Sequence, residues 1–342
     1  ATGLLDEAFD LALRSDESIV VAVVALGLHG TLLAARGKLE EALGYYRRAI
    51  EMGSEASTFC PAVAQGYLGL ANAHYQRNEL DAAAEEAEKA LALAKQAGVF
   101  EIVDNANLLH ARLALIAADL SRVEALLEQA GEIDPSRMVM NPDGKSWTVI
   151  RGELLLARDE VGAAVQWAAE RGLQAAEIFG RDPKTRIPWP KLSEGVLLAR
   201  VLLAQGRVED ALSLLARLIA AAEAHQYAVV LLDATVLQAA ARHLQNDNLR
   251  ALQSLERALA LAAPEGYLRP FLEAGEAMDK LLRRAIGQGL EVDHAKRALA
   301  ALSAQTRAAG ERLAPDAGGA VDRAAAAGAA IAGRGPLQHR GG

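Results

Sequence analysis

The chain has 342 residues, of which 52% are hydrophobic and only 4% aromatic, so it has enough apolar material for a sizeable core. A formal net charge of −8 argues against a surface that binds duplex DNA, because such a surface needs clustered Lys and Arg. The single cysteine, Cys60, excludes an internal disulfide and a cysteine-based zinc site, and it indicates a reducing compartment, for which we expect the cytoplasm.

The first predicted pair of helices ends in the stretch GKLEEALGYYRRAIEMG, residues 37–53. Small residues at Ala42 and Ala49 and a ring at Tyr46 share one face, and the charged residues fall on the other. This spacing predicts an amphipathic helix that crosses a neighbouring helix closely. The apolar run before it, which begins at Ile19, is too short to span a bilayer and predicts a buried helix, so we expect no membrane contact.

The same pattern returns five times along the chain. In each copy a turn-forming or polar stretch precedes an amphipathic helix, and another helix precedes the turn. The copies are NELDAAAEEAEKAL from Asn78, ADLSRVEALLEQA from Ala118, DEVGAAVQWAAERG from Asp159, GRVEDALSLLARL from Gly206 and NDNLRALQSLERALAL from Asn246. The equivalent small or branched positions are Ala42, Ala83, Val123, Ala164, Ala211 and Ala251, spaced by 41, 40, 41, 47 and 40 residues.

A helical hairpin cannot bury its apolar face alone, but stacked hairpins share a continuous core. The sequence therefore predicts an all-α fold, a right-handed superhelical solenoid of helical hairpins with a period of about 40 residues. We expect residues 1–287 to form this repeat domain, with six recognisable units and a partial N-terminal helix. Residues 288–342 are expected to form a helical or low-complexity tail rich in Ala and Gly. The longer gap contains the prolines of residues 173–194, which interrupt any continuous helix there.

The order of Leu, Gly, Tyr-type and Ala positions in these units resembles the tetratricopeptide repeat (TPR), whose basic period is 34 residues. With its longer period, the array is similar to the sensor region of the large MalT-like, LuxR-type transcription regulators. The most specific match is PEGYLRPFLEAG, which resembles the way that family ends its repeat array. The matching stretches are AAVQWAAERGL (163–173), LARVLLAQGRVEDALSLLARLIAAAEAHQ (198–226) and ALQSLERALALAAPEGYLRPFLEAGEAMDKLLRRA (251–285), and the resemblance covers roughly residues 5–287.

This resemblance implies a region that receives an inducer or a protein partner and passes its state to an ATP-binding module and a DNA-binding module. The sequence contains no GxxxxGK[ST] phosphate loop, and the helix-turn-helix expected soon after Ala285 is missing. We therefore expect this chain to be part of a longer protein. By itself it should neither turn over ATP nor bind nucleic acid directly.

No motif in the chain predicts catalysis. The seven histidines form neither HxxxH nor HExxH, no GxSxG is present, and Cys60 has no base motif next to it in the sequence. Exposed pairs of glutamates on helix faces are typical of solvated charges. We therefore expect no enzyme activity, no catalytic residue, no metal site and no cofactor.

Binding is better supported, because the first helix of each unit should line the inner wall of such a solenoid. Aligned by their small residues, the units place Arg112, Glu153 and Arg200 at the same inner position, so these side chains should share one concavity. Charges of both signs and one ring suit a small polar inducer, in particular an acidic or polyhydroxylated one, or a peptide. The candidate binding residues are Gln65, Asn72, Tyr75, Gln76, Asn105, Arg112, Glu153, Arg200, Asp233 and His243.

Two functions follow from this interpretation. The first is a ligand-sensing and protein-interaction repeat region of a LuxR/MalT-type regulator, without the ATPase and DNA-binding modules. The alternative is a general TPR scaffold that holds a partner's peptide or helix in its concave groove. Any concave wall in contact with water also carries polar residues, whether or not it binds a ligand. The ten residues are therefore first predicted to line the wall, and their binding role is a separate hypothesis.

Overall fold

The computed structural model describes residues 19–55, 60–131, 141–142, 144–180, 187–275 and 277–313. In these ranges the ordered elements are helices and no strand is present, which confirms the predicted all-α class. The chain divides into two compact units, Ala1–Leu302 and Ser303–Gly342. The second is described only by the C-terminal part of one helix.

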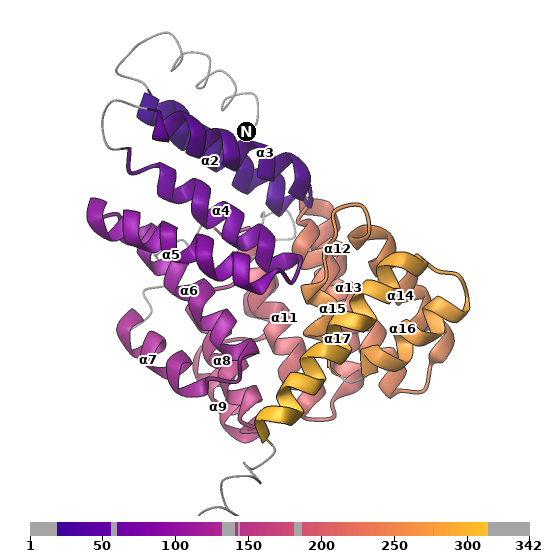
Figure 1. Ribbon diagram of the computed structural model, residues 1–342. Coiled ribbons are helices and arrows are strands. Elements are labelled where there is room, and N and C mark those ends of the chain that lie inside the picture. The colour runs from indigo at the N-terminus through magenta and orange to yellow at the C-terminus, as the bar shows by residue number, and fades with distance from the viewer. Residues whose placement is uncertain are drawn as a thin grey trace, which may run out of the picture. The chain divides into compact units, whose positions relative to one another are not determined.

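Six helical hairpins follow one another in the first unit (Figure 1). The first helix of each hairpin packs on the first helix of the next hairpin. The second helix of each hairpin packs on the first helix of its own hairpin and on the helix that begins the next part of the stack. This is the stacking predicted for a hairpin solenoid. The first helices are α2 (Ile19–Ala35), α4 (Val63–Gln76), α6 (Phe100–Ile116), α8 (Trp147–Ala157), α11 (Trp189–Ala204) and α13 (Ala228–Leu244). The second helices are α3 (Leu39–Ser54), α5 (Leu80–Ala97), α7 (Leu120–Ala130), α9 (Val161–Glu170), α12 (Val208–His225) and α14 (Asn248–Ala262).

The turn within each hairpin has the same backbone conformation in all six units. One residue has a positive φ in every turn, and it always lies five positions before the small residue of the second helix. These residues are Gly37, Asn78, Ala118, Asp159, Gly206 and Asn246. In the second hairpin the Asn78 amide donates to the Tyr75 carbonyl and the Glu79 amide to the His74 carbonyl, both at 2.9 Å. This left-handed cap satisfies the last carbonyls of the first helix and turns the chain into the second.

Alanine occupies the left-handed position in the third turn, where Ala118 has φ +55°. An L-residue with a Cβ is strained in this conformation, whereas glycine is not. We expect Ala118→Gly to raise the free energy of unfolding by about 0.5–1 kcal/mol, measured by urea denaturation. Ala117, its neighbour, has a helical φ of −72°, so Ala117→Gly should lower the same quantity by about 1 kcal/mol. A loss of stability in both variants would contradict this assignment of strain.

The small residues predicted to mark helix crossings are all completely buried: Ala42, Ala83, Val123, Ala164, Ala211 and Ala251. Tyr46 is also fully buried, between the first helices of the first and second hairpins. Its ring lies against Gly30 of α2 and Gly69 of α4, and a Cβ at Gly30 would come within 2.6 Å of it. The two glycines therefore make the space that the ring fills, as the sequence pattern indicated for the seam.

The 47-residue spacing between the fourth and fifth units is filled partly by a short helix, α10 (Ala175–Phe179), before residues 181–186, which lie outside the described ranges. Helix α11 then begins at Trp189, and Pro190 lies in its first turn, where its missing amide costs no hydrogen bond. Pro190 thus lies at the start of a new helix and does not interrupt one.

After α14 the chain turns back onto the first helices. Residues 265–273, which we call the return segment, include the short helix α15 (Arg269–Leu272). Tyr267, Phe271 and Leu272 of this segment belong to one buried cluster with Leu39 of α3 and Val229 of α13. The Leu268 amide donates to the Gln76 carbonyl at the end of α4, at 2.9 Å. The return segment therefore joins the early hairpins to the last one through one apolar core.

Two further helices follow, α16 (Ala277–Gly287) and α17 (Val292–Leu313). Ala295, Ala298 and Leu302 of α17 are buried in the same cluster as the return segment. The compact unit thus continues to Leu302, past the boundary at residues 287/288 that we drew from the sequence, and that boundary stays a prediction. Residues beyond Leu313 lie outside the described ranges.

Candidate carboxylate-binding site

The last residue of the return segment, Glu273, is surrounded by three hydrogen-bond donors from distant parts of the chain and by Arg269 of its own segment. The Tyr75 hydroxyl donates to Glu273 Oε1 at 2.8 Å, and Arg269 Nη2 lies 3.5 Å from the same oxygen. Lys145 Nζ donates to Oε2 at 2.8 Å, and Arg200 Nη2 lies 3.5 Å from it. Arg200 Nη1 also donates to the Glu273 backbone carbonyl at 2.6 Å. Both carboxylate oxygens are therefore bound, and we call these four donors the carboxylate site.

Three of the four donors come from the first helices or the approach to one. Tyr75 is in the last turn of α4, Arg200 is in α11, and Lys145 lies two residues before α8. The fourth, Arg269, comes from the return segment itself. The wall formed by the first helices of the second, fourth and fifth hairpins thus converges on one carboxylate, and we call this surface the inner wall.

Further charged side chains contact the donors of the carboxylate site. The Arg112 guanidinium lies over the Tyr75 ring, 3.9 Å from its centroid, and Arg269 lies 5.4 Å from the same ring. Such stacking fixes the direction of the phenol and places positive charge near its oxygen. Glu153 accepts from Lys145 Nζ at 3.1 Å. The cluster therefore combines four basic side chains with two carboxylates.

Burial and charge act in opposite directions on Glu273. Burial alone would raise the pKa of its carboxyl, but Lys145, then Arg269, Arg200 and Arg112, hold that pKa well below its ordinary value. Burial alone would likewise lower the pKa of Lys145, and the carboxylates of Glu153 and Glu273 outweigh it and raise that pKa. Glu273 and Lys145 are therefore both charged at neutral pH, so the cluster is an ionic one.

The site is nearly closed but not sealed from solvent. The side chain of Lys145 is 7% exposed, that of Glu273 15%, that of Arg200 16% and that of Glu153 17%. Electrostatic interactions in such a place are screened less than on the surface. Glu273, Arg200 and Glu153 thus keep a small part of their side chains at the surface, whereas Tyr75, Lys145 and Arg269 are buried.

The structure brings together four of the ten candidate residues around Glu273: Tyr75, Arg112, Glu153 and Arg200. Three others make their hydrogen bonds elsewhere: Gln65 with Thr31 at 3.4 Å, Asn105 with the Glu101 carbonyl at 2.8 Å, and His243 with Asn248 at 3.2 Å. Asp233 is buried within α13. The role of all ten in binding stays a prediction.

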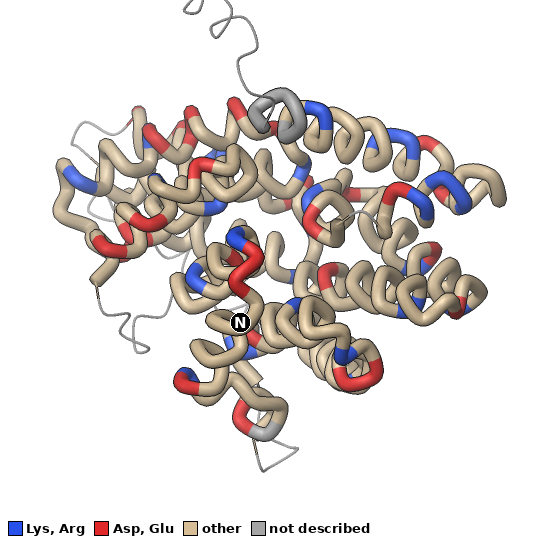
Figure 2. The backbone as a smooth tube through the Cα atoms, turned by 90° about the horizontal axis from the view of Figure 1, so that it is seen from below, with Lys and Arg blue, Asp and Glu red and all other residues tan. Residues whose placement is uncertain are grey.

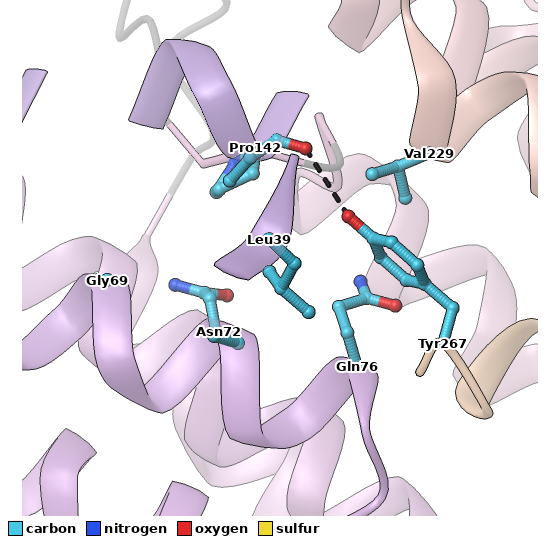
Figure 3. Close-up of a pocket in the computed structure, with 9 residues that line it drawn as sticks. Leu39, Gly69, Asn72, Gln76, Pro142, Val229 and Tyr267 are labelled. Carbon is cyan, nitrogen blue, oxygen red and sulfur yellow. Dashed lines mark hydrogen bonds between the residues drawn. The ribbon is translucent and has the colours of Figure 1, made fainter. Parts of the chain in front are cut away.

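Asn72 and Gln76, the remaining two candidates, line a small cavity that the return segment closes (Figure 3). Tyr267 forms one side of it, with its hydroxyl 3.5 Å from the Ala34 carbonyl, and Leu39 and Val229 point into it from other helices. The cavity measures about 10 Å³, which is room for no more than one water molecule. A ligand therefore has no space beside Asn72 and Gln76 while the return segment is in place.

Sequence reasoning missed Lys145, Arg269 and Glu273, which make most of the ionic contacts. Lys145 lies between two helices, and the other two lie past the last repeat, so none occupies a repeated helical position. One signal was present, because PEGYLRPFLEAG places an acidic residue directly after a group of rings and leucines in a stretch that departs from the repeat pattern.

The start of the return segment is held by a separate ion pair. Arg77, at the end of α4, donates from Nε to the Glu265 carbonyl at 3.2 Å and pairs with Glu40 at 2.5 Å. The Glu40 amide in turn donates to the Glu265 carboxylate at 2.8 Å. The first and second hairpins thus clasp one end of the segment, and the carboxylate site binds the other.

His294 of α17 ties that helix to the middle of the return segment. Its Nε2 lies 2.9 Å from the Tyr267 carbonyl, its Nδ1 lies 2.9 Å from Arg297, and its ring meets Phe271 edge-on. Burial, then the charge of Arg297, lowers the pKa of His294 and outweighs the hydrogen bond to Tyr267. The folded protein therefore binds this proton less readily than the unfolded chain does.

This difference predicts a loss of stability on acidification. As the pH falls through about 6.5, the unfolded chain takes up the proton first, so the free energy of unfolding should decrease towards the lower folded-state pKa. We expect the melting temperature to fall between pH 7.5 and 5.5 at constant ionic strength, and His294→Gln to reduce that dependence. Burial also lowers the pKa of His110, so part of the slope should persist. Identical slopes in the wild type and the variant would contradict the assignment.

Outside this cluster, Lys and Arg are interspersed with Asp and Glu along the described helices (Figure 2). Over the same part of the chain, no group of three or more His, Cys, Asp or Glu is arranged to hold a metal ion. None of the described helices has the length and apolar character needed to cross a membrane.

Comparison with known proteins gives one informative match. The family model described as the MalT-like TPR region matches residues 1–288. No curated protein matches the chain. Among solved structures, the chain is similar to a "Circular tandem repeat protein with novel repeat topology and enhanced subunit contact surfaces", with 14% identity over 90% of this chain and 89% of that chain. The TM-score of 0.17 is too low for that likeness to support any conclusion.

Proposed function

The chain belongs to the MalT-like TPR family, and from this premise we propose that it is the ligand-sensing and partner-binding repeat region of a LuxR-type transcription regulator. We place it in the cytoplasm, in keeping with its single, buried cysteine. Its role is binding rather than catalysis, and the ATPase and DNA-binding steps belong to other modules. Membership in the family supports the repeat region, and the sensing role is our inference.

One observation carries the proposal. The inner wall contributes a phenol, an ammonium and one guanidinium group to the carboxylate site, and Arg269 of the return segment adds a second guanidinium, so that both carboxylate oxygens are bound. Arg and Lys are the side chains best suited to bind an anion in a partly desolvated place. We therefore propose that the external ligand is acidic, and that hydroxyl groups next to its carboxylate can bind Glu153.

Signal transmission follows from the origin of the donors. Tyr75, Lys145 and Arg200 belong to different hairpins, so the spacing of these hairpins depends on what occupies the carboxylate site. A ligand of different size binds one spacing better than another and shifts the population towards it. The neighbouring modules of the regulator would detect this change in the stack.

A scaffold for a partner peptide is the second candidate function. It is favoured by the return segment itself, a short stretch of chain that the inner wall already binds through a backbone hydrogen bond, buried rings and a carboxylate. A partner carrying an acidic residue after apolar ones could bind in the same way.

The test is a thermal-shift screen of the wild-type chain against acidic metabolites, neutral sugars and acidic peptides, followed by calorimetry on any that bind. We expect acidic compounds to raise the melting temperature, and Arg200→Gln to weaken their binding at least tenfold. Arg207→Gln is the matched control, because Arg207 pairs with Asp210 on the surface at the end of the same hairpin's turn. An affinity for acidic compounds that Arg200→Gln leaves unchanged would contradict the proposal, and so would binding of neutral sugars alone.

A further inference from the structure

Glu273 is the residue of the return segment whose carboxylate the four donors bind, and it lies next to the residues that anchor the segment. Phe271 is fully buried and Leu272 is 3% exposed, so both hold the segment in the core. Glu273 lies just beyond them, at the C-terminal end of α15, with its side chain 15% exposed. Gly275 follows with φ +84°, a conformation that glycine adopts without strain. Release of the Glu273 carboxylate would therefore need rotation of its own side chain and not the removal of Phe271 from the core.

The carboxylate site recognises a chemical group rather than a particular residue. Beyond its Cα, a glutamate side chain is a propionate group. Within Glu273, these donors contact the carboxylate oxygens, except Arg200 Nη1, which binds the backbone carbonyl. A free carboxylate of similar size satisfies the same donors, since hydrogen bonds to the anion depend on its oxygens and on the distances to them.

From this geometry we infer that Glu273 is a resident competitor: it occupies the carboxylate site in the absence of ligand, and a free small carboxylate binds by replacing it. This inference rests on the proposed function and adds its regulation. An attached group competes at an effective concentration on the order of millimolar. Glu273 therefore makes the wild-type site respond only to acids that are abundant or that gain further contacts, with Glu153 for example.

Replacement of Glu273 also has a mechanical consequence. Arg200 contacts both the side chain and the backbone carbonyl of Glu273, so it ties α11 to the end of the return segment. When a ligand takes the carboxylate position, the side-chain part of this tie is lost, whereas the clasp formed by Glu40 and Arg77 at the other end stays in place. The ligand thus loosens one end of the segment only.

The test is a chemical rescue of Glu273→Ala with propionate, which supplies the carboxylate and the Cγ that the substitution removes, together with one more carbon. The full chain is melted with increasing propionate at constant ionic strength, and the uncharged isostere propionamide is the control. We expect propionate to raise the melting temperature of Glu273→Ala, with an apparent affinity at least tenfold higher than for the wild type. Propionamide should have no such effect.

Three further variants make the outcome specific. Glu273→Gln keeps the shape of the side chain without its charge, so it should also bind propionate more tightly than the wild type does, even if Glu273→Ala fails to fold. Glu273→Ala/Arg200→Gln should lose the rescue. Glu256→Ala removes an exposed glutamate from α14 and should respond to propionate no more strongly than the wild type does.

Two results would overturn the inference. If propionate binds the wild type and Glu273→Ala equally well, Glu273 does not compete for the site, and the proposed binding of acids by the inner wall still stands. If propionate binds neither protein nor Glu273→Gln, the carboxylate site accepts no free acid of this size. The proposed function is then judged separately, by whether Arg200→Gln weakens ligand binding to the otherwise unchanged chain.

Discussion

Glu273→Ala is expected to lower the free energy of unfolding by about 3–5 kcal/mol, the largest effect of any single substitution proposed for this chain. The variant leaves Lys145 and Arg200 largely buried without the carboxylate that both contact. Removing one partner of a buried ion pair costs more than the pair itself contributes, because the remaining charge stays desolvated. Urea denaturation monitored by circular dichroism measures the change directly.

The matched control for this prediction is Glu256→Ala, which makes the same chemical change on an exposed face of α14. We expect the control to change the free energy of unfolding by no more than about 0.5 kcal/mol. A similarly small change in Glu273→Ala would show that water solvates Lys145 and Arg200 once the carboxylate is removed. The ionic contacts of the carboxylate site would then contribute little to stability.

Gly69→Ala should be the second most damaging change, with a cost of about 1–3 kcal/mol from overpacking. A Cβ at Gly69 would overlap the ring of Tyr46 even more closely than the Cβ at Gly30 would. The ring cannot move aside easily, because it is completely buried and lies between α2 and α4. The cost therefore includes a shift of one helix relative to the other, and equilibrium unfolding would detect it.

The same substitution at Gly44 should have the opposite sign. Gly44 lies on the exposed side of α3, and a Cβ there would meet no atom within 4 Å. Alanine favours the helix over glycine by about 0.5–1 kcal/mol, so Gly44→Ala should stabilise the protein. If Gly69→Ala were stabilising as well, the Tyr46 ring would not be packed tightly between α2 and α4.

The repeat architecture could be predicted because its determinants are local and recur. A single period governs both the buried small residues, Ala42 to Ala251, and the left-handed turn residues, Gly37 to Asn246. Each turn residue lies five positions before its small residue, so the turn and the crossing form one unit. Tyr46 could be assigned to the seam from its spacing to Ala42 and Ala49. Its glycine partners, Gly30 and Gly69, lie on other helices and needed the structure.

The candidate site was harder to predict, since its centre breaks the repeat. Tyr75, Arg112, Glu153 and Arg200 were found by aligning the first helices, because residues at equivalent positions face the same wall. Glu273 is far from all four in sequence and follows the last unit, so no periodicity points to it. Local pattern therefore identifies the wall, whereas only tertiary structure identifies what the wall binds.

Alignment also has a limit at the ends of helices. His243 lies in the last turn of α13, and its ring bonds to Asn248 at the start of α14 instead of reaching the cluster. Gln65, near the start of α4, bonds to Thr31 of the preceding hairpin. Side chains in the terminal turns of a helix contact the adjoining hairpin turn or the neighbouring helix. Residues at equivalent positions in the aligned repeats therefore do not always point the same way.

We claim that the inner wall recognises a carboxylate, and a double-mutant cycle between Lys145 and Glu273 measures this recognition. Lys145→Met, Glu273→Gln and the double variant are unfolded in urea beside the wild type, all near neutral pH. We predict that the two single changes are far from additive, with a coupling energy of at least about 1.5 kcal/mol, because Lys145 and Glu273 pair at 2.8 Å in a largely buried place. Additivity within about 0.5 kcal/mol would contradict the claim.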